Sequence, residues 1–389
     1  MRKWCLAMFI LALILLLIGC NASNEKEETK EASVLNIPDF IVEVESGRDP
    51  IILQLTDTQI LDAAQQRVPN RISSEQAAYY ATDRMDENCF DYIKETVKAT
   101  KPDLILVTGD LVYGEFDDKG TSLLALIEVM ESFDIPWAPV FGNHDNESKM
   151  GADWQSAQLE SAQNCLFKQR TLTGNGNYTV GIKQDDKLKR VFFMLDSNGC
   201  YAVSEESKAN GHTVSDVGFG QNQIDWYTQT ANTIRALSPN TKFSFAFHIQ
   251  LQIFSVIENK YDYNGEFVNI DTLEDKDPED FGLIGATLKG PWDGNRKVWD
   301  GLKALGVDSI FVGHEHCNSA SIVYQGIRLQ FGQKTGTYDR VNYLRPNGKI
   351  YGAYPPITGT PLVGGTVIPL SKEDGSIQNP YIYLCKTAQ

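Results

Sequence analysis

The chain has 389 residues, of which 42% are hydrophobic and 22% are charged. This composition is typical of a soluble globular protein with enough apolar side chains for a large core. The formal net charge is −16, and binding to nucleic acid depends on neutralising phosphates with lysine and arginine, so we expect no nucleic-acid partner.

The first twenty residues have the pattern of an export signal. A basic pair at positions 2 and 3 precedes the uncharged apolar run Trp4–Ile18, which is shorter than the ~20 residues that a transmembrane helix needs. The run leads into Leu-Ile-Gly-Cys at positions 17–20, which resembles the lipobox of bacterial lipoproteins. We interpret residues 1–20 as a lipoprotein signal peptide with Cys20 as the lipidation site. A plain signal peptide with an incidental cysteine is the alternative.

The segment after Cys20 is polar and rich in glutamate and lysine, and such a segment cannot bury enough apolar surface to order itself. We expect residues 21–40 to be a tether and residues 41–389 to be the catalytic domain. The predicted location is exported, with a lipid anchor on the extracytoplasmic face of a bacterial membrane.

Several apolar runs have the length of strands, and most are continuous, as in strands buried on both faces. They lie at 51–55, 104–107, 137–141, 191–195, 243–247 and 309–312. Apolar residues recur at helical spacing in 87–99, 121–133 and 224–237. The alternation predicts a layered α/β fold. We expect strands and turns after residue 328, and a lid or substrate wall from the polar stretch 257–293.

Potential metal ligands follow five of these strand candidates. In α/β sheets such strand-end loops are where sites form. Four of the chain's five histidines stand there, which is hard to explain by chance. The sequences are Thr56-Asp57-Thr58-Gln59, Gly109-Asp110, Gly142-Asn143-His144-Asp145, His248 and Gly313-His314-Glu315-His316.

These motifs, in this order, resemble those of the calcineurin-like metallophosphoesterase superfamily. The resemblance runs from Asp57 to His316 and implies a sandwich of two mixed β-sheets flanked by helices, with a dinuclear metal site on strand-end loops. It implies that Asp110 bridges the two metals and that Asp57 and His316 hold the first. It implies a second-metal set of Asn143, His248 and His314.

Imidazole and carboxylate ligands suit Fe, Zn, Mn or Ni. In the family, the histidine at the position of His144 faces the substrate. We expect His144 to stabilise the phosphoryl group or to protonate the leaving oxygen. Asp145 is a candidate for orienting the His144 ring, and a helix N-cap is an equally good interpretation.

The first motif departs from the family pattern, because Gln59 stands where the family usually has histidine. Gln59 can offer an oxygen as a weaker ligand. Tyr113, three residues after Asp110, is the other candidate, since the purple acid phosphatase branch has a metal-binding tyrosine at that offset. A packed loop aromatic remains the simpler interpretation of Tyr113.

The resemblance implies a hydrolase for small phosphorylated substrates, in which a metal-bridging hydroxide attacks phosphorus. We expect a phosphomonoesterase, because the sequence has no evident basic clamp for a larger substrate. A phosphodiesterase of the same fold is the first alternative. A surface lipoprotein that binds metal or phosphate without turnover is the second, because of Gln59.

Overall fold

The computed structural model describes residues 33–65, 72–81, 84–198, 218–286, 296–354 and 359–386. The predicted signal peptide, Cys20 and most of the predicted tether lie outside these residues. Val34 is buried, and Leu35 and Ile37 pack against the same hydrophobic cluster. The folded body therefore includes residues ahead of the domain start predicted at residue 41.

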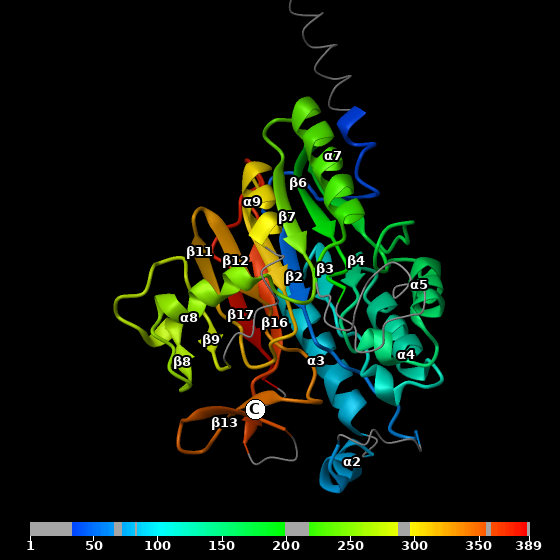
Figure 1. Ribbon diagram of the computed structural model, residues 1–389, viewed down its shortest axis with the longest axis vertical. Coiled ribbons are helices and arrows are strands. Elements are labelled where there is room, and N and C mark those ends of the chain that lie inside the picture. Colours follow the sequence, from blue (N-terminus) through cyan, green and yellow to red (C-terminus); the bar gives the residue numbers. More distant parts are fainter. Residues whose placement is uncertain are drawn as a thin grey trace, which may run out of the picture.

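Seven strands form the larger sheet, which is mixed (Figure 1). β6, β7, β10 and β12 run parallel, whereas β5 is antiparallel to β6 and β11 is antiparallel to β12. The order across the sheet is β1 (Phe40–Glu43), β5 (Tyr178–Gln184), β6 (Lys187–Met194), β7 (Lys242–Ala246), β10 (Ser309–Val312), β12 (Ile327–Phe331) and β11 (Ser321–Tyr324).

Five strands form the second sheet, which is also mixed. Its order is β17 (Tyr381–Leu384), β16 (Gly364–Pro369), β2 (Ile51–Leu55), β3 (Leu104–Thr108) and β4 (Trp137–Val140). β2, β3 and β4 run parallel, and β16 is antiparallel to both of its neighbours. The parallel strands carry the motifs in the amino-terminal half of the chain.

The two sheets share one hydrophobic core. Phe192 and Met194 of β6 belong to the same buried cluster as Ile52 of β2, whereas Val191 and Phe193 belong to a second cluster on the other face of β6. This alternation follows the two-residue period of a strand. Gln54 of β2 also donates to Val312 O at 3.0 Å, so a buried polar contact joins the sheets and fixes their relative position.

Helices cover the outer faces of this sandwich (Figure 1). α3 (Arg84–Thr100), α4 (Thr121–Glu131) and α5 (Ala152–Ser161) contribute to the core of the smaller sheet, and α7 (Gln221–Leu237) and α9 (Arg296–Ala304) to that of the larger one. In the part of the chain that the structure describes, no helix is both long and apolar enough to cross a membrane.

Short elements lie around the carboxyl ends of the parallel strands. They include α2 (Ser74–Tyr80), α8 (Val256–Lys260) and the 3-10 helices η1 (Gly114–Phe116), η2 (Asp145–Glu147), η3 (Gln252–Ser255) and η4 (Ile270–Thr272). Two small sheets pair β8 (Val268–Asn269) with β9 (Leu283–Ile284), and β13 (Val341–Leu344) with β14 (Ile350–Ala353) and β15 (Thr360–Pro361).

The layered α/β prediction with two mixed sheets flanked by helices is confirmed. All six predicted strands and all three predicted helices are present, with ends shifted by a few residues. The predicted lid, residues 257–293, contains part of α8 together with η4, β8 and β9 in its described portion, and Ala286 from this stretch lines the cavity beside the predicted ligands.

Candidate metal centre

The predicted ligand residues come together at one end of the sandwich. Because β2, β3 and β4 are parallel, as are β7 and β10, the loops that follow them gather at the carboxyl edges of the two sheets. Gln59 and His316, which are 257 positions apart in the chain, lie in contact there. The loops carry Asp57 and Gln59, Asp110 and Tyr113, Asn143 and His144, His248, and His314 and His316.

The loops are tight, and several residues adopt the left-handed backbone conformation. A non-glycine residue in this backbone conformation costs about 1–3 kcal/mol. It persists where the surrounding structure holds it, often at a functional site. Gly142 permits a close approach, since a Cβ there would lie 2.2 Å from Asp110 Oδ1. The positive φ angles are 50° at Asp57, 48° at Gln59, 51° at Asp110 and 71° at His314.

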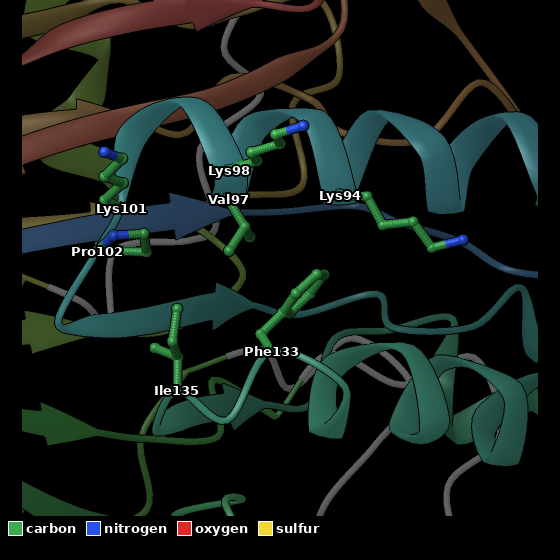
Figure 2. Close-up of a pocket in the computed structure, with 7 residues that line it drawn as sticks. All are labelled: Lys94, Val97, Lys98, Lys101, Pro102, Phe133 and Ile135. Carbon is green, nitrogen blue, oxygen red and sulfur yellow. The ribbon is translucent and has the colours of Figure 1, made fainter.

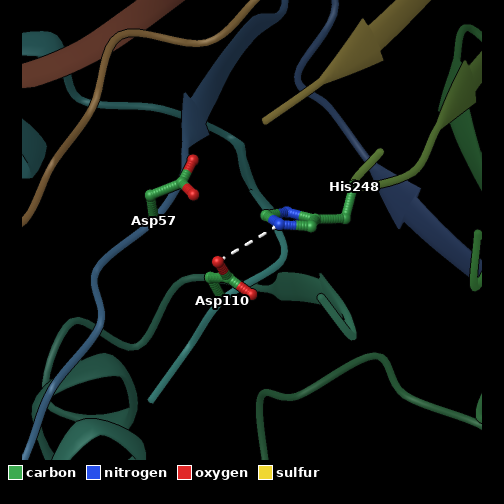
Figure 3. Close-up of side chains that lie close together, drawn as sticks. All are labelled: Asp57, Asp110 and His248. Carbon is green, nitrogen blue, oxygen red and sulfur yellow. Dashed lines mark ion pairs between the residues drawn. The ribbon is translucent and has the colours of Figure 1, made fainter. Parts of the chain in front are cut away.

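Asp110 lies at the centre of the cluster. Its Oδ2 is 3.2 Å from His248 Nε2, and Oδ1 accepts a hydrogen bond from the backbone N–H of His144 at 2.8 Å. Ligand atoms of Asp57, Asp110 and His248 all lie within 4.8 Å of one another, and all three residues are buried. Figure 3 shows the three side chains converging from separate loops, which is the arrangement that a bound cation needs.

On one side of Asp110 lie Asn143, His248 and His314, which we call the Asn143 half. Asn143 Oδ1 is 3.2 Å from His248 Nε2 and 2.8 Å from His314 Nδ1. The Nδ1 atom of His248 is 2.8 Å from the carbonyl oxygen of Thr108. That contact assigns the ring proton to Nδ1 and leaves the Nε2 lone pair for a metal, as outer contacts of ligand histidines commonly do.

On the other side lie Asp57, Gln59, His316 and Lys334, which we call the Gln59 half. Asp57 Oδ1 is 3.1 Å from His316 Nε2. That oxygen is buried and has no hydrogen-bond partner of suitable geometry among the described residues, whereas Oδ2 accepts from Thr56 Oγ1 at 2.7 Å and from the backbone N–H of His314 at 3.2 Å. A buried carboxylate oxygen left free beside an imidazole fits a metal ligand.

Lys334 completes the Gln59 half, and no sequence motif points to it. It follows β12 and is 1% exposed. Its Nζ donates to Gln59 Oε1 at 2.5 Å and to the carbonyl oxygen of Asp57 at 3.2 Å. Burial lowers the pKa of Lys334, although the carboxylate of Asp57 opposes this.

Buried charges dominate the centre. Burial raises the pKa of Asp57, but the adjacent His316 outweighs it and brings the pKa to about 2. Burial lowers the pKa of His248, but the Asp110 carboxylate brings it to about 9. Burial and the neighbouring His248 lower the pKa of His314 to about 3. Metal ions bind the deprotonated forms of such groups, so metal binding here is coupled to proton release.

His144 lies beside the ligands with its ring held on two sides. Nδ1 is 2.6 Å from Glu147 Oε2, and Nε2 is 3.7 Å from Asp339 Oδ2. Burial lowers the pKa of His144, but the carboxylates of Asp110 and Glu147 outweigh it and raise the pKa to about 9. The structure therefore holds this imidazole close to the Asp110 loop with a carboxylate behind it.

Asp145 has a different position from the one that the sequence suggested. Its carboxylate accepts the backbone N–H groups of Gly142 at 2.7 Å and Val112 at 3.0 Å, and so ties the β4 loop to the β3 loop. Among the described contacts, Glu147 and not Asp145 meets the His144 ring. The 3-10 helix η2 explains this, because Glu147 returns to the ring three residues after His144.

Tyr113 is buried in an aromatic cluster. Its ring stacks on Phe116 with centroids 5.4 Å apart, and lies 4.5 Å from the His144 ring at an angle of 33°. Tyr80 and Tyr338 belong to the same cluster. The ring therefore supports one face of His144.

The centre opens into a cavity of about 220 Å³. Arg340 and Tyr354, which come from the segments around the small β13 sheet, line it together with Ala286 and the ligand residues. A larger hollow of about 450 Å³ lies at the opposite end of β3, between α3 and the segment before β4, and is lined by Lys94, Lys98, Lys101 and apolar residues (Figure 2). Residues of the strand-end loops line the smaller cavity, and none of them lines the larger hollow.

Comparison with known proteins gives the family of this fold. Residues 51–318 match the calcineurin-like phosphoesterase family. The chain belongs to the calcineurin-like phosphoesterase family. Relatives include Probable inactive purple acid phosphatase 29 of Arabidopsis thaliana, 26% identical over 72% of this chain and 70% of the relative. Phosphatase DCR2 of Saccharomyces cerevisiae is 28% identical over 60% of this chain, but the match spans only 39% of the yeast protein.

Two solved structures are also similar to the chain. A dimetal phosphatase from Danio rerio matches with 11% identity and a TM-score of 0.43, over 83% of this chain and 95% of that one. The purple acid phosphatase PPD1 of yellow lupin matches with 13% identity and a TM-score of 0.40, over 86% of this chain and 53% of that one.

The calcineurin-like family uses a dinuclear metal centre, and the residues present fit such a group. The free buried oxygen of Asp57 and the converging atoms of Asp57, Asp110 and His248 are suited to cations. Sequence reasoning missed Glu147, Lys334, Asp339 and Arg340. Glu147 lies two residues after the Gly-Asn-His-Asp motif and was open to detection as a charge at helical spacing from His144. The other three come from a segment without a motif.

Proposed function

We propose that the chain is a metal-dependent phosphomonoesterase that hydrolyses small phosphate esters. The observation that carries this proposal is the position of His144, whose ring lines the cavity shared by Asp110, Asn143, His314 and His316 while Glu147 holds its Nδ1 from behind. The naming of the yeast relative as a phosphatase supports it. The naming of the Arabidopsis relative as inactive makes a direct test of turnover essential.

Two bound ions would supply Lewis-acid activation of water and of the phosphoryl oxygens. Asp110 would bridge them, Asp57 and His316 would hold one, and Asn143, His248 and His314 would hold the other. The ions themselves are Fe, Zn, Mn or Ni in this proposal, since the ligands are imidazoles, carboxylates and an amide without a thiolate. Elemental analysis of the purified protein identifies them.

The imidazole of His144 acts as the general acid. Glu147 fixes the ring by accepting from Nδ1–H, which directs Nε2–H toward the cavity and favours the protonated form. Nε2 then donates its proton to the oxygen of the leaving alcohol. A proton delivered in this way contributes about 10²–10⁴-fold to the rate of such a reaction.

The cavity favours a small substrate. A volume of about 220 Å³ is enough for a phosphate group and a short portion of the alcohol. Arg340 lines the same cavity and offers a planar set of N–H donors to phosphate oxygens. Tyr354, which is 54% exposed, stands at the edge of the cavity and offers a ring to the alcohol.

A paired assay tests the proposal. The purified protein, loaded with each candidate metal, is given an aryl phosphate monoester and the matched aryl diester. Faster turnover of the monoester is expected. Faster turnover of the diester makes the chain a phosphodiesterase instead. Two bound metals without hydrolysis of either ester make it a binding protein.

The His144→Ala variant tests the role of the imidazole. We expect turnover to fall by about 10²–10⁴-fold while bound metal stays at two ions per chain, because the ring touches the cavity and is absent from the ligand set. Elemental analysis and the monoester assay are made on the same preparation. Loss of metal from this variant contradicts the assignment.

We also propose that the protein is exported and anchored by lipid at Cys20. The apolar run and the Leu-Ile-Gly-Cys sequence before the folded body support this. Cys20→Ala is expected to abolish incorporation of labelled fatty acid and to move the protein from the membrane fraction. Unchanged labelling and fractionation contradict the anchor.

A further inference from the structure

Two carboxamides reach the metal centre, and they present opposite atoms to it. The oxygen of Asn143 lies between His248 Nε2 and His314 Nδ1, at 3.2 and 2.8 Å. The oxygen of Gln59 instead accepts from Lys334 Nζ at 2.5 Å, and its Nε2 lies 3.4 Å from Asp110 Oδ2 and 3.3 Å from His316 Nε2. Only an amide oxygen is a metal ligand, so this difference decides what each side chain can do.

The neighbours of Gln59 fix its orientation. If the amide were reversed, its oxygen would face the carboxylate of Asp110 and its NH2 group would face the amine of Lys334, so acceptors and donors would be opposed at both ends. Nζ of Lys334 donates in either of its protonation states, and it already donates to the Asp57 carbonyl. The observed orientation pairs the amide oxygen with the Lys334 donor and the amide NH2 group with the Asp110 carboxylate.

Lys334 is itself held firmly in place. The backbone N–H groups of Thr335 and Gly336, which follow it, donate to the carbonyl oxygens of Thr56 and Asp57 at 3.0 and 3.2 Å. The loop after β12 is therefore joined to the loop after β2 by two backbone bonds. These bonds hold the backbone at Lys334 beside Gln59, and the bond from Nζ to the Asp57 carbonyl oxygen directs the side chain.

We infer that Gln59 is a hydrogen-bond donor to Asp110 and not a metal ligand, and that the ion in the Gln59 half is consequently held more weakly than its neighbour and exchanges with free metal. The inference rests on the dinuclear centre of the proposed function. It gives the Gln59 half the ligands Asp57, Asp110 and His316, against Asp110, Asn143, His248 and His314 in the Asn143 half.

Manganese titration of the metal-free full-length protein tests this, with calorimetry for the two dissociation constants and electron paramagnetic resonance for bound Mn²⁺. The wild type is expected to bind two ions with dissociation constants at least about tenfold apart. Asn143→Ala is expected to weaken the tighter ion by about 100-fold, because losing a ligand costs at least the 10–100-fold typical of outer contacts. Gln59→Ala removes an outer contact to Asp110, which both ions share, so it is expected to weaken both ions by similar factors of at most about 10–100-fold.

Variants that add a ligand to the Gln59 half test the same inference by the opposite change. Gln59→His is expected to tighten the weaker ion by about tenfold or more. Lys334→Met frees the amide oxygen and is also expected to tighten it. In the double variant Gln59→Ala/Lys334→Met this gain is expected to vanish, whereas a gain caused only by removing the lysine charge persists. Lys189→Met, another buried lysine that donates to backbone carbonyls, is the control and leaves both constants unchanged.

Weakening of the ion in the Gln59 half alone, by about tenfold or more, in Gln59→Ala overturns the inference, and so do two equal constants in the wild type. Gln59→Met, closer in volume, replaces Gln59→Ala if circular dichroism shows a loss of fold. The metal constants are independent of ester hydrolysis. An inactive protein with the expected constants refutes only the phosphomonoesterase proposal. An active protein in which Gln59→Ala weakens only the ion of the Gln59 half refutes only the role of the amide.

Discussion

The two halves of the centre contain similar residue types but are built differently. In the Asn143 half, every predicted ligand faces the others, and the backbone carbonyl of Thr108 orients the His248 ring from behind. In the Gln59 half, the histidine usual for the family is replaced by an amide whose oxygen belongs to Lys334. The motifs alone supply all the ligands of the Asn143 half, whereas the arrangement of the Gln59 half depends on Lys334, far along the chain.

This difference shows that a departure from a motif has to be read together with its surroundings. Gln59 alone suggests a weaker ligand, because the sequence does not say which amide atom faces the metal. Lys334 supplies that information, since its Nζ donates to the amide oxygen. The same substitution without Lys334 would leave the oxygen free for a cation.

The largest effect is expected from the residue that both halves share. Asp110→Asn removes the bridging charge and is expected to lose most bound metal and to lower turnover by about thousandfold or more, since each ion contributes several kcal/mol to the reaction. Elemental analysis and the monoester assay measure both. Retention of both metals by this variant would contradict the view that the two halves share Asp110, because the halves would then bind metal independently.

The support of His144 is expected to have the next largest effect. Glu147→Gln keeps a hydrogen bond to Nδ1 but removes a carboxylate that raises the pKa of His144. Loss of that charge lowers the pKa, so the protonated imidazole is lost at lower pH. We expect turnover to fall about tenfold. In the pH dependence of turnover, we expect the decline on the basic side, the basic limb, to move to lower pH.

Asp145→Asn is the matched control for Glu147→Gln. Its carboxylate bonds backbone N–H groups of the β3 and β4 loops and not the His144 ring. We therefore expect lower stability in thermal unfolding but no movement of the basic limb. A limb that moves with Asp145→Asn and stays with Glu147→Gln would return the orienting role to Asp145.

Much of the architecture and the ligand set was predictable because it depends on local patterns. Continuous apolar runs followed by Asp, Asn or His gave the strand ends, and parallel strands bring those ends together. What escaped prediction depends on contacts between distant segments. Lys334, Asp339 and Arg340 approach the centre from the segment after β12, where nothing in the local sequence indicates which side chain turns inward. The buried Val34 was not placed in the folded body from the sequence, because it directly follows the polar stretch 21–33.

Tyr113→Phe tests whether the Gln59 half gains a ligand that the motifs leave open. The ring stacks on Phe116 and packs at a tilt against His144, and phenylalanine preserves that packing. We expect metal content within about twofold of the wild type, in line with conservative aromatic exchange, and a visible spectrum that does not change. A charge-transfer band that disappears in this variant would instead place iron and tyrosinate in the Gln59 half and make the two halves equal in ligand number.

The smallest effect concerns the stability of the fold at low pH, which limits the pH range in which the two halves can be compared. Asp39 accepts from Thr179 N at 3.0 Å and pairs with Lys168 and Arg170. Burial raises its pKa, but the two cations outweigh this and hold it below the ordinary value of 3.8. A carboxyl group whose pKa is lower in the folded than in the unfolded chain stabilises the fold at pH values above its unfolded pKa, and that stability is lost as pH falls through the folded pKa.

Asp39→Asn is expected to lower the free energy of unfolding by about 1–3 kcal/mol at pH 7 and to make that free energy fall less steeply with acid. Urea unfolding between pH 7 and pH 3 measures both. An unchanged slope would mean that other carboxylates with a lowered pKa, such as Asp57 and Asp110 in the metal centre, account for the acid sensitivity.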